Sequence, residues 1–394
     1  MRHLSLKPRE DRRLRAGHLW IFSNEVDVKK TPLTDFAPGE DALVLDAGGK
    51  CLGTAYVNPA SLICARLVSR ASDAPLDADM LRQRLQTALA LRQRLYAAPY
   101  YRLCHGEGDW LPGLVIDRYG DVLAVQMTTA GMEARRDALV EVLAELLRPS
   151  CIALRNDTAS RALEQLPAYC EDALGVSPDE LDVPENGAVF RIPFAQGQKT
   201  GWFYDQRRNR AEAARYAQGA TVLDAFCYAG GFGVAAASAG AAAVTFLDAS
   251  ATALDYARCN LASNAPQCQG ASIRGDALHE LAVLREAGTR FDVVCIDPPA
   301  FIKRRKDMAQ GLAAYKKINM LAAELVTPGG ILVSCSCSHH LETEALRGCV
   351  MHAAARRGFL GQLLWQGTQG PDHPIHISMP ETAYLKCVVA RLQK

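Results

Sequence analysis

The sequence lacks the features that mark a membrane or a secreted protein. Nowhere in its 394 residues do 18 or more uncharged apolar residues follow one another, so we expect no transmembrane helix and no membrane partner. The stretch from Met1 to Arg9 lacks the apolar run of a signal peptide. There are 13 cysteines, an odd number with no repeating framework, which favours reduced thiols and a cytoplasmic protein.

The composition is typical of a soluble globular protein with two or three domains. Hydrophobic residues make up 49% and charged residues 22% of the chain, which is too long for one ordinary domain. The net charge is +3 over residues 1–70, −7 over 71–184 and +5 over 185–394. Two basic ends around an acidic middle permit a polyanionic partner, although ordinary fluctuation would produce the same asymmetry.

Residues 1–72 have the pattern of a small β-barrel. Short predicted strands alternate with turns, at Asp41–Asp46, Cys51–Val57 and Leu62–Val68. Before them, Arg12 and Arg13 precede Trp20 and Phe22, a combination that binds phosphates and stacks on bases. An exposed basic turn beside buried aromatic side chains would explain that segment equally well.

Two further parts follow. Residues 73–184 are predicted to form a central α+β domain, with helices over Asp77–Tyr96 and Arg135–Leu147 and a hairpin over 113–126. In residues 185–394 strands alternate with helices, the strands being Thr221–Asp224, Ala243–Asp248, Phe291–Asp297 and Ile331–Cys335. This order predicts an α/β fold with a Rossmann-like, doubly wound parallel sheet. We expect Thr382–Arg391 to be a last strand at the sheet edge.

Acidic residues and glycines gather at the predicted strand ends, where a doubly wound sheet binds its ligands. The first strand ends at Asp224, and the next turn contains Gly230, Gly231 and Gly233, where glycine lets the backbone approach a ligand closely. The second strand ends at Asp248, which can accept hydrogen bonds from both ribose hydroxyls, and Asp276 is placed to meet an adenine edge. Each acid could instead cap a helix, and the glycine turn could be purely structural.

The spacing favours S-adenosylmethionine over a dinucleotide as the cofactor. The glycines follow Asp224 in the pattern D-x5-G-G-x-G, which differs from the G-x-G-x-x-G pyrophosphate fingerprint. An acid at the end of the first strand would repel a pyrophosphate, but it suits the cationic amino acid end of S-adenosylmethionine.

The turn after the third strand indicates a nucleotide base as the methyl acceptor. Two prolines make the turn Asp297-Pro-Pro-Ala-Phe301 rigid. Asp297 and the carbonyl groups around Pro298 can accept hydrogen bonds from an exocyclic amine, and Phe301 can stack on the base. Lys303 and Arg304 follow, in a position to bind phosphates, unless they simply form a solvated loop.

The fourth strand leads into Ser334-Cys-Ser-Cys-Ser338, which makes Cys335 and Cys337 candidate nucleophiles. C5 of cytosine is a poor nucleophile, and addition of a thiolate at C6 makes it enamine-like. Methylation of an exocyclic amine needs no cysteine, so the two thiols bear directly on the target atom.

With these motifs the chain resembles the bacterial 23S rRNA large-subunit methyltransferase I family, which forms 5-methylcytidine. The resemblance covers almost the full length and is carried by segments 9–22, 113–120, 197–210, 222–233, 297–301, 334–338 and 372–374. It implies an N-terminal PUA domain and 23S rRNA as the partner, with Cys337 as the nucleophile. It also implies that Asp205 and Arg208 help to close the cofactor pocket. One departure is Ala300, where many RNA cytosine-5 methyltransferases have a second cysteine after the Pro-Pro turn.

Three other functions stay open: an exocyclic-amine RNA methyltransferase, a non-catalytic RNA-binding protein and, more remotely, a nicotinamide oxidoreductase. The sequence predicts no metal, and it leaves a homodimer open.

Overall fold

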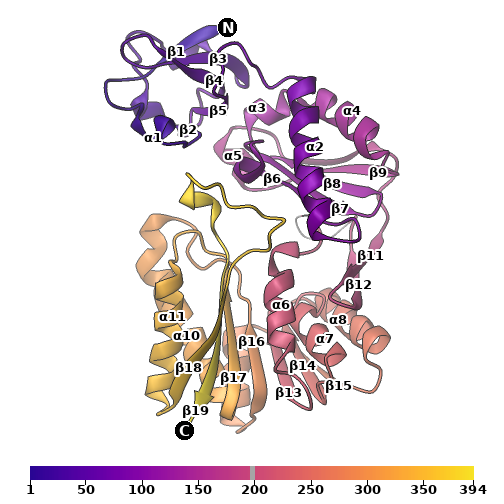
Figure 1. Ribbon diagram of the computed structural model, residues 1–394. Helices are drawn as coiled ribbons and strands as arrows, with labels where there is room; N and C mark the ends of the chain where they lie inside the picture. Colours follow the sequence, from indigo (N-terminus) through magenta and orange to yellow (C-terminus); the bar gives the residue numbers. More distant parts are fainter. Residues whose placement is uncertain (196–199) are drawn as a thin grey trace. The chain divides into compact units, whose positions relative to one another are not determined.

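The computed structural model describes residues 1–195 and 200–394, so Gly197 to Lys199 of the predicted 197–210 motif lie outside the described residues. The chain divides into two compact units (Figure 1). The N-terminal unit consists of residues 1–179, 193–201 and 371–382, and the C-terminal unit of residues 180–192, 202–370 and 383–394. The three-domain division at residues 72 and 184 stays a prediction. Within the described ranges, no helix is long and apolar enough to cross a membrane.

The first sheet of the N-terminal unit has the strand order β1-β3-β4-β5-β2. Its strands are β1 (Arg2–Ser5), β2 (Trp20–Ile21), β3 (Glu40–Leu45), β4 (Cys51–Val57) and β5 (Ala65–Ser69), and the basic segment forms the short helix α1 (Arg12–Arg15). The predicted strand 62–68 starts three residues late. The cause is a bend over residues 61–63, after which the Cys64 carbonyl accepts a hydrogen bond from the Asn58 N–H at 2.8 Å.

The second sheet of this unit has the order β10-β9-β8-β7-β6. Its strands are β6 (Tyr100–His105), β7 (Leu114–Tyr119), β8 (Val122–Met127), β9 (Cys151–Asn156) and β10 (Tyr169–Leu174); the helices are α2 (Ala78–Leu95), α3 (Ala130–Glu133), α4 (Arg136–Leu147) and α5 (Ser160–Leu163). Helix α2 starts where the Asp77 carboxylate accepts a hydrogen bond from the Met80 N–H. It buries Leu81, Leu85 and Ala88, which lie on one face at helical spacing.

Residues 371–382, which we call the return segment, belong to the N-terminal unit although they lie between two strands of the C-terminal unit in the sequence. The Arg92 guanidinium is fully buried and donates to both oxygens of Asp109 and, at 2.7 Å, to the carbonyl of Asp372. The Asp372 carboxylate accepts a hydrogen bond from the Arg102 N–H at 3.1 Å. Met379 joins the apolar core around the first sheet. The return segment is therefore an integral part of this unit.

The C-terminal unit is built on a seven-stranded sheet in the order β15-β14-β13-β16-β17-β19-β18. The first five strands are parallel, and β19 is antiparallel to both β17 and β18. The strands are β13 (Thr221–Ala225), β14 (Ala243–Asp248), β15 (Gln269–Arg274), β16 (Phe291–Ile296), β17 (Val326–Ser336), β18 (Leu360–Gly367) and β19 (Lys386–Gln393). A separate two-stranded sheet pairs β11 (Glu180–Glu185) with β12 (Ala188–Pro193).

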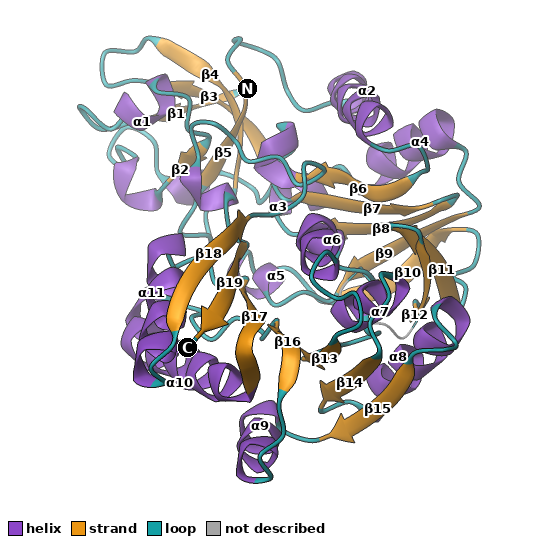
Figure 2. Ribbon diagram, turned by 60° about the horizontal axis from the view of Figure 1, so that its bottom comes forward, coloured by secondary structure: helices purple, strands orange, loops and turns teal. Residues whose placement is uncertain are grey.

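Helices cover both faces of the seven-stranded sheet. They are α6 (Arg207–Ala214), α7 (Gly231–Ser238), α8 (Ala251–Asn264), α9 (Ala277–Glu286), α10 (Met308–Leu325) and α11 (Thr343–Arg356). Figures 1 and 2 show α10 and α11 on one side of the sheet and α6, α7 and α8 on the other. The predicted doubly wound α/β fold is confirmed.

One placement in the sheet was wrong. The last strand does not lie at the edge, because β18 pairs along its outer side from Leu360 to Gly367. Strands β15 and β18 were not predicted from the sequence. Both are edge strands with mostly exposed side chains, so neither shows the run of buried apolar residues that marks a central strand.

Candidate active site

The carboxyl ends of the parallel strands bring the predicted acids and the cysteine pair to one edge of the sheet. In the strand register, Asp224 of β13 lies between Phe246 of β14 and Cys295 of β16. On the far side of β16, Ile296 pairs with Ser334 of β17. Residues just beyond these positions, including Asp248, Asp297 and Cys337, therefore end on the same side of the C-terminal unit.

Asp224 holds the glycine turn in place. Its side chain is 1% exposed, and Oδ2 accepts a hydrogen bond from the Gly233 N–H at 2.7 Å. Burial raises the pKa of Asp224 to about 7, and the neighbouring charges of Asp297 and Asp248 act in the same direction, whereas the Gly233 hydrogen bond opposes them. The carboxyl group is therefore poised to ionise near neutral pH.

The glycines let α7 approach the sheet closely. A Cβ atom on Gly233 would lie 2.5 Å from Phe246 Cε1 and 2.7 Å from Val244 Cγ1, so a larger residue would push α7 away from β14. Gly230 has a φ of +84°, in the left-handed region. Two residues of the same turn, Phe226 and Tyr228, also have left-handed φ values of 63° and 49°. This strain, on the order of 1 kcal/mol or more for each, sharpens the turn and was not foreseen from the sequence.

Asp248 and Asp276 both hold backbone N–H groups. The two oxygens of Asp248 accept hydrogen bonds from the Tyr228 N–H at 3.0 Å and the Ser250 N–H at 2.9 Å. Asp276 caps α9 by accepting from the His279 N–H at 3.1 Å. A carboxylate offers about four lone-pair sites, so each acid retains acceptor capacity for a ligand.

Asp205 and Arg208 are the two residues predicted to close the cofactor pocket. Asp205 is partly buried and hydrogen-bonded, whereas Arg208 lies on the surface. Asp205 Oδ2 accepts a hydrogen bond from the Tyr384 hydroxyl at 2.6 Å. Its other oxygen, Oδ1, is buried without a hydrogen-bond partner among the described residues. A buried carboxylate oxygen without such a partner can accept a hydrogen bond from the ammonium group of a ligand, such as the amino acid end of S-adenosylmethionine. Arg208 is exposed.

A buried cluster that was not predicted from the sequence lies next to the glycine turn. The Arg210 guanidinium donates to both oxygens of Glu185, at 2.6 and 2.9 Å, and lies 4.5 Å from the ring centre of Trp202. Trp202 Nε1 donates to the same carboxylate at 2.9 Å. A Cβ atom on Gly231 would meet Arg210 Cδ at 3.1 Å, so this cluster packs against the glycine turn. Glu185 is 25 positions from Arg210, and no local pattern links them.

The Asp-Pro-Pro turn follows β16 directly. The Asp297 N–H donates to the carbonyl of Ala225, which ties the turn to the end of β13. Pro298 is buried, and the Phe301 ring packs against Tyr315 with 4.9 Å between ring centres. Lys303 and Arg304 are exposed, and Arg304 pairs with Asp307 at 3.0 Å.

The structure separates the two candidate cysteines. Cys335 lies within β17, is 1% exposed and faces Cys387 of β19, and burial raises the pKa of its thiol far above the usual value. Cys337 follows the last residue of the strand and is partly exposed. A nucleophile must reach its substrate as a thiolate, so Cys337 is the better placed of the two.

Arg12 and Arg13 belong to the N-terminal unit. Arg12 is exposed. Arg13 donates to Glu25 at 2.7 Å and lies over the Phe22 ring, so much of its bonding capacity stays within the unit.

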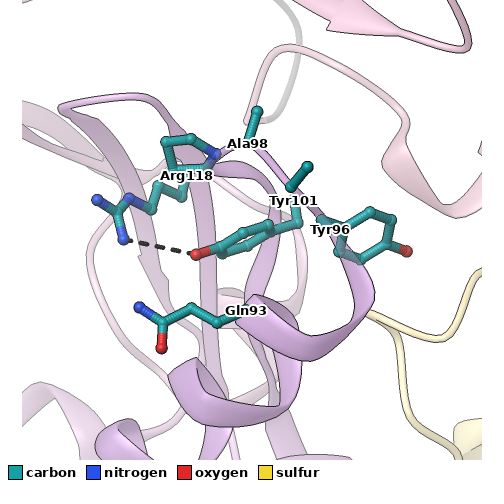
Figure 3. A pocket seen from close by; sticks show the side chains of 7 residues that line it. Gln93, Tyr96, Ala98, Tyr101 and Arg118 are labelled. Atoms are coloured by element: carbon teal, nitrogen blue, oxygen red, sulfur yellow. Dashed lines mark hydrogen bonds between the residues drawn. The ribbon is translucent and has the colours of Figure 1, made fainter.

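The same unit contains a surface pocket that holds none of the predicted site residues. Gln93, Tyr96, Ala98, Tyr101 and Arg118 line it, and the Arg118 guanidinium donates to the Tyr101 hydroxyl at 3.5 Å (Figure 3). Its lining contains neither an acid nor a thiol, so it offers no carboxylate to hold a cationic cofactor and no cysteine nucleophile.

Comparison with known proteins defines the class. A family model described as an S-adenosylmethionine-dependent methyltransferase matches residues 101–364, and one described as a PUA-like domain matches residues 4–70. A solved structure of a SAM-dependent methyltransferase from Streptococcus mutans has the same fold, with a TM-score of 0.84, 20% identity and coverage of 99% of this chain and 100% of that one. The chain is thus an S-adenosylmethionine-dependent methyltransferase with a PUA-like domain, which confirms the predicted cofactor.

Closer relatives define the family. The ribosomal RNA large subunit methyltransferase I of Shewanella amazonensis is 37% identical over 99% of both chains. That of Aeromonas hydrophila is 38% identical over 98% of both chains. The chain belongs to the ribosomal RNA large subunit methyltransferase I family.

Proposed function

We propose that this chain methylates C5 of a cytidine in 23S rRNA and that Cys337 is the nucleophile. The observation that carries the proposal is the position of Cys337, partly exposed just beyond β17 and on the same sheet edge as the glycine turn. Relatives of nearly equal length are named as ribosomal RNA large subunit methyltransferases, which supports large-subunit rRNA as the substrate.

In this proposal the acidic side of the edge holds the cofactor. Asp224, through the turn with Gly230, Gly231 and Gly233, shapes the pocket, and Asp205 Oδ1 accepts from the ammonium group. Asp248 and Asp276 use their remaining lone pairs for the ribose and the adenine. S-adenosylmethionine supplies a methyl group activated by a positively charged sulfur.

The other side of the edge holds the base. Asp297 accepts from the exocyclic amine with one oxygen and, protonated in the complex, donates to N3 with the other. Pro298 and Phe301 shape the base pocket, and Lys303 and Arg304 attract phosphates. In the N-terminal unit, Arg12 and the outer part of Arg13 would meet the RNA backbone.

Cys337 carries the covalent steps. Its thiolate adds to C6, forming an S–C6 bond and placing electron density on C5, which then accepts the methyl group. Loss of the C5 proton and cleavage of the S–C6 bond restore the aromatic ring and the thiolate. Because position 300 is alanine, the proton goes to water or to a base other than a second cysteine.

The test uses 23S rRNA transcribed with 5-fluorocytidine, whose C5 carries fluorine in place of the proton that must leave after methyl transfer. The wild-type protein should form a covalent complex with this RNA, and Cys337→Ala should form none. Cys335→Ala, a matched change two residues away, should still form it. A complex that survives in Cys337→Ala would overturn the assignment.

Methylation of an exocyclic amine is the second candidate, because the Asp-Pro-Pro turn also suits an amine acceptor. Mass spectrometry of nucleosides from unmodified rRNA distinguishes the two. The leading proposal requires 5-methylcytidine, and an N-methylated base formed equally well by Cys337→Ala would favour the amine.

A further inference from the structure

Lys386 is a buried cation beside the end of β17. It is the first residue of β19, pairs with Ser336 in the strand register and is only 5% exposed. Its Nζ donates to the carbonyl oxygen of Ser338 at 2.6 Å and to that of Tyr384 at 2.9 Å. Within residues 1–195 and 200–394, no carboxylate lies within 4.0 Å of it to form an ion pair. Burying an ammonium group with hydrogen bonds to carbonyls but no ion pair is unfavourable, which makes Lys386 a candidate for a functional role.

The charges around Lys386 connect it to Cys337. Burial lowers the pKa of Lys386, while the negative charge of Glu342 and that of an ionised Cys337 act against this shift. Energetic coupling between two titrating groups is reciprocal, so an ammonium that gains from a thiolate stabilises that thiolate equally.

The backbone on both sides of Cys337 is fixed. The buried hydroxyls of Ser336 and Ser338 both bond to the Tyr315 hydroxyl, at 2.7 and 2.9 Å. Ser338 Oγ also accepts from the Ile302 N–H at 3.1 Å. Because Lys386 donates to the carbonyl of Ser338, the residue after Cys337, its ammonium group is tied to the chain segment that carries the thiol.

Four other titratable groups surround this strand end. Tyr315 from α10 feels the charge of Cys337, and Asp297, after β16, acts on the neighbouring thiol of Cys335. Glu342, before α11, acts electrostatically on Lys386 and favours its charged form, and His339 lies two residues after Cys337. The negative charge of Asp297 opposes ionisation of Cys335, whereas the positive charge of Lys386 favours a thiolate at Cys337.

We infer that Lys386 is a positioning residue that stabilises the thiolate of Cys337, through a buried ammonium held by the carbonyls of Ser338 and Tyr384. The inference rests on the proposed role of Cys337. The thiol proton leaves to solvent, Lys386 stays protonated, and the sulfur lone pair forms the bond to C6.

The experiment measures alkylation of individual cysteines by iodoacetamide against pH, resolved by peptide mass spectrometry, in the full chain. Lys386→Gln keeps hydrogen-bond donors but removes the charge, and Lys386→Arg keeps the charge. In Lys386→Gln we expect the midpoint for Cys337 to rise by about one pH unit. Its rate at neutral pH should fall about threefold, because a tenfold smaller thiolate fraction is partly offset by a more nucleophilic thiolate. Lys386→Arg should stay close to the wild-type midpoint.

Other cysteines of the same chain serve as internal controls. The exposed Cys170 and Cys259 should react identically in all variants, and the buried Cys335 and Cys387 should stay protected. An unchanged Cys337 midpoint in Lys386→Gln, with the buried thiols still protected, would overturn the inference.

A second variant decides the matter if Lys386→Gln opens the sheet and exposes the buried thiols. Lys386→Met keeps an unbranched side chain in the same buried position and removes the charge, without placing an amide there. The Cys337 midpoint should rise as expected for Lys386→Gln, and an unchanged midpoint with Cys335 and Cys387 still protected would overturn the inference.

Methyl transfer gives an independent readout. In Lys386→Gln, kcat should fall with KM unchanged and should recover as the pH is raised, which a merely structural defect would not do. Failure of the proposed function looks different, because Cys337→Ala would then remain active whatever Lys386 does to thiol reactivity.

Discussion

The ends of β13 and β17 lie on one edge of the same sheet. A buried acidic group lies at the first end, and a buried basic group lies beside the second. At β13, Asp224 is 1% exposed and is held by a backbone N–H; beside β17, Lys386 is 5% exposed and is held by two backbone carbonyls. Burial moves both pKa values towards neutrality, upward for the acid and downward for the amine. The comparison shows how one edge can serve two partners: the anionic half suits a cationic cofactor, and the cationic half suits a thiolate.

The largest effect should come from adding a side chain at Gly233, where α7 packs closely against β14 beside Asp224. Gly233→Ala would place a Cβ 2.5 Å from Phe246 Cε1, and overpacking of this kind costs about 1–3 kcal/mol. If the turn takes up the strain, affinity for S-adenosylmethionine should fall about 10- to 100-fold, measured by calorimetry. The control is Gly348→Ala in α11, where the added Cβ meets nothing within 4 Å. Unchanged cofactor affinity in Gly233→Ala would show that the turn tolerates the displacement.

The next effect is a pH dependence located at Asp224. Its folded pKa of about 7 lies above its ordinary value of 3.8, so the free protein should lose stability as the pH rises from about 4 to about 7. A cationic cofactor favours the ionised acid, and its affinity should therefore rise about tenfold between pH 6 and pH 8. Asp224→Asn keeps an oxygen for the Gly233 N–H and should abolish both dependences, in thermal melts and in calorimetry. A wild-type affinity that is flat over this range would contradict the prediction.

The smallest effect should come from removing an exposed positive charge, that of Arg304, in contrast to the buried charge of Lys386. Arg304→Ala should weaken rRNA binding only a few-fold and reduce the slope of log affinity against log salt by about one. The matched control is Arg258→Ala on α8, since both arginines are exposed and pair with an acid three residues away. Equal loss in the two variants would mean that Arg304 makes no specific phosphate contact.

The central strands were predictable and the edge strands were not. Strands β13, β14 and β16 are short, largely apolar strands with an acid at or next to their last residue, and this pattern located the sheet edge and its acids. Strands β15 and β18 bury little, so they carry no such run. Strand order is set by pairing between distant segments, which explains why β19 was wrongly placed at the edge.

At the site, spacing identified residue types but not their contacts. The acid–glycine pattern led to Asp224 and Gly233, and the structure adds the hydrogen bond between them. The left-handed Phe226 and Tyr228 were unpredictable, because aromatic residues seldom adopt that conformation. Lys386 was missed because a lysine at the start of a strand is ordinarily solvated, and only the pairing of β19 with β17 reveals its burial.

The return segment has a consequence for the order in which the chain matures during synthesis. The chain crosses between the two units five times, and the N-terminal unit takes Met379 and the main chain of Asp372 into its interior. At about 5–20 residues per second, residue 382 is translated roughly 10–40 s after residue 179. Throughout that interval the first-made half of the polypeptide has an unfilled core. A nascent chain that stops before residue 371 can complete neither half, so translation must nearly finish before either half reaches its final form.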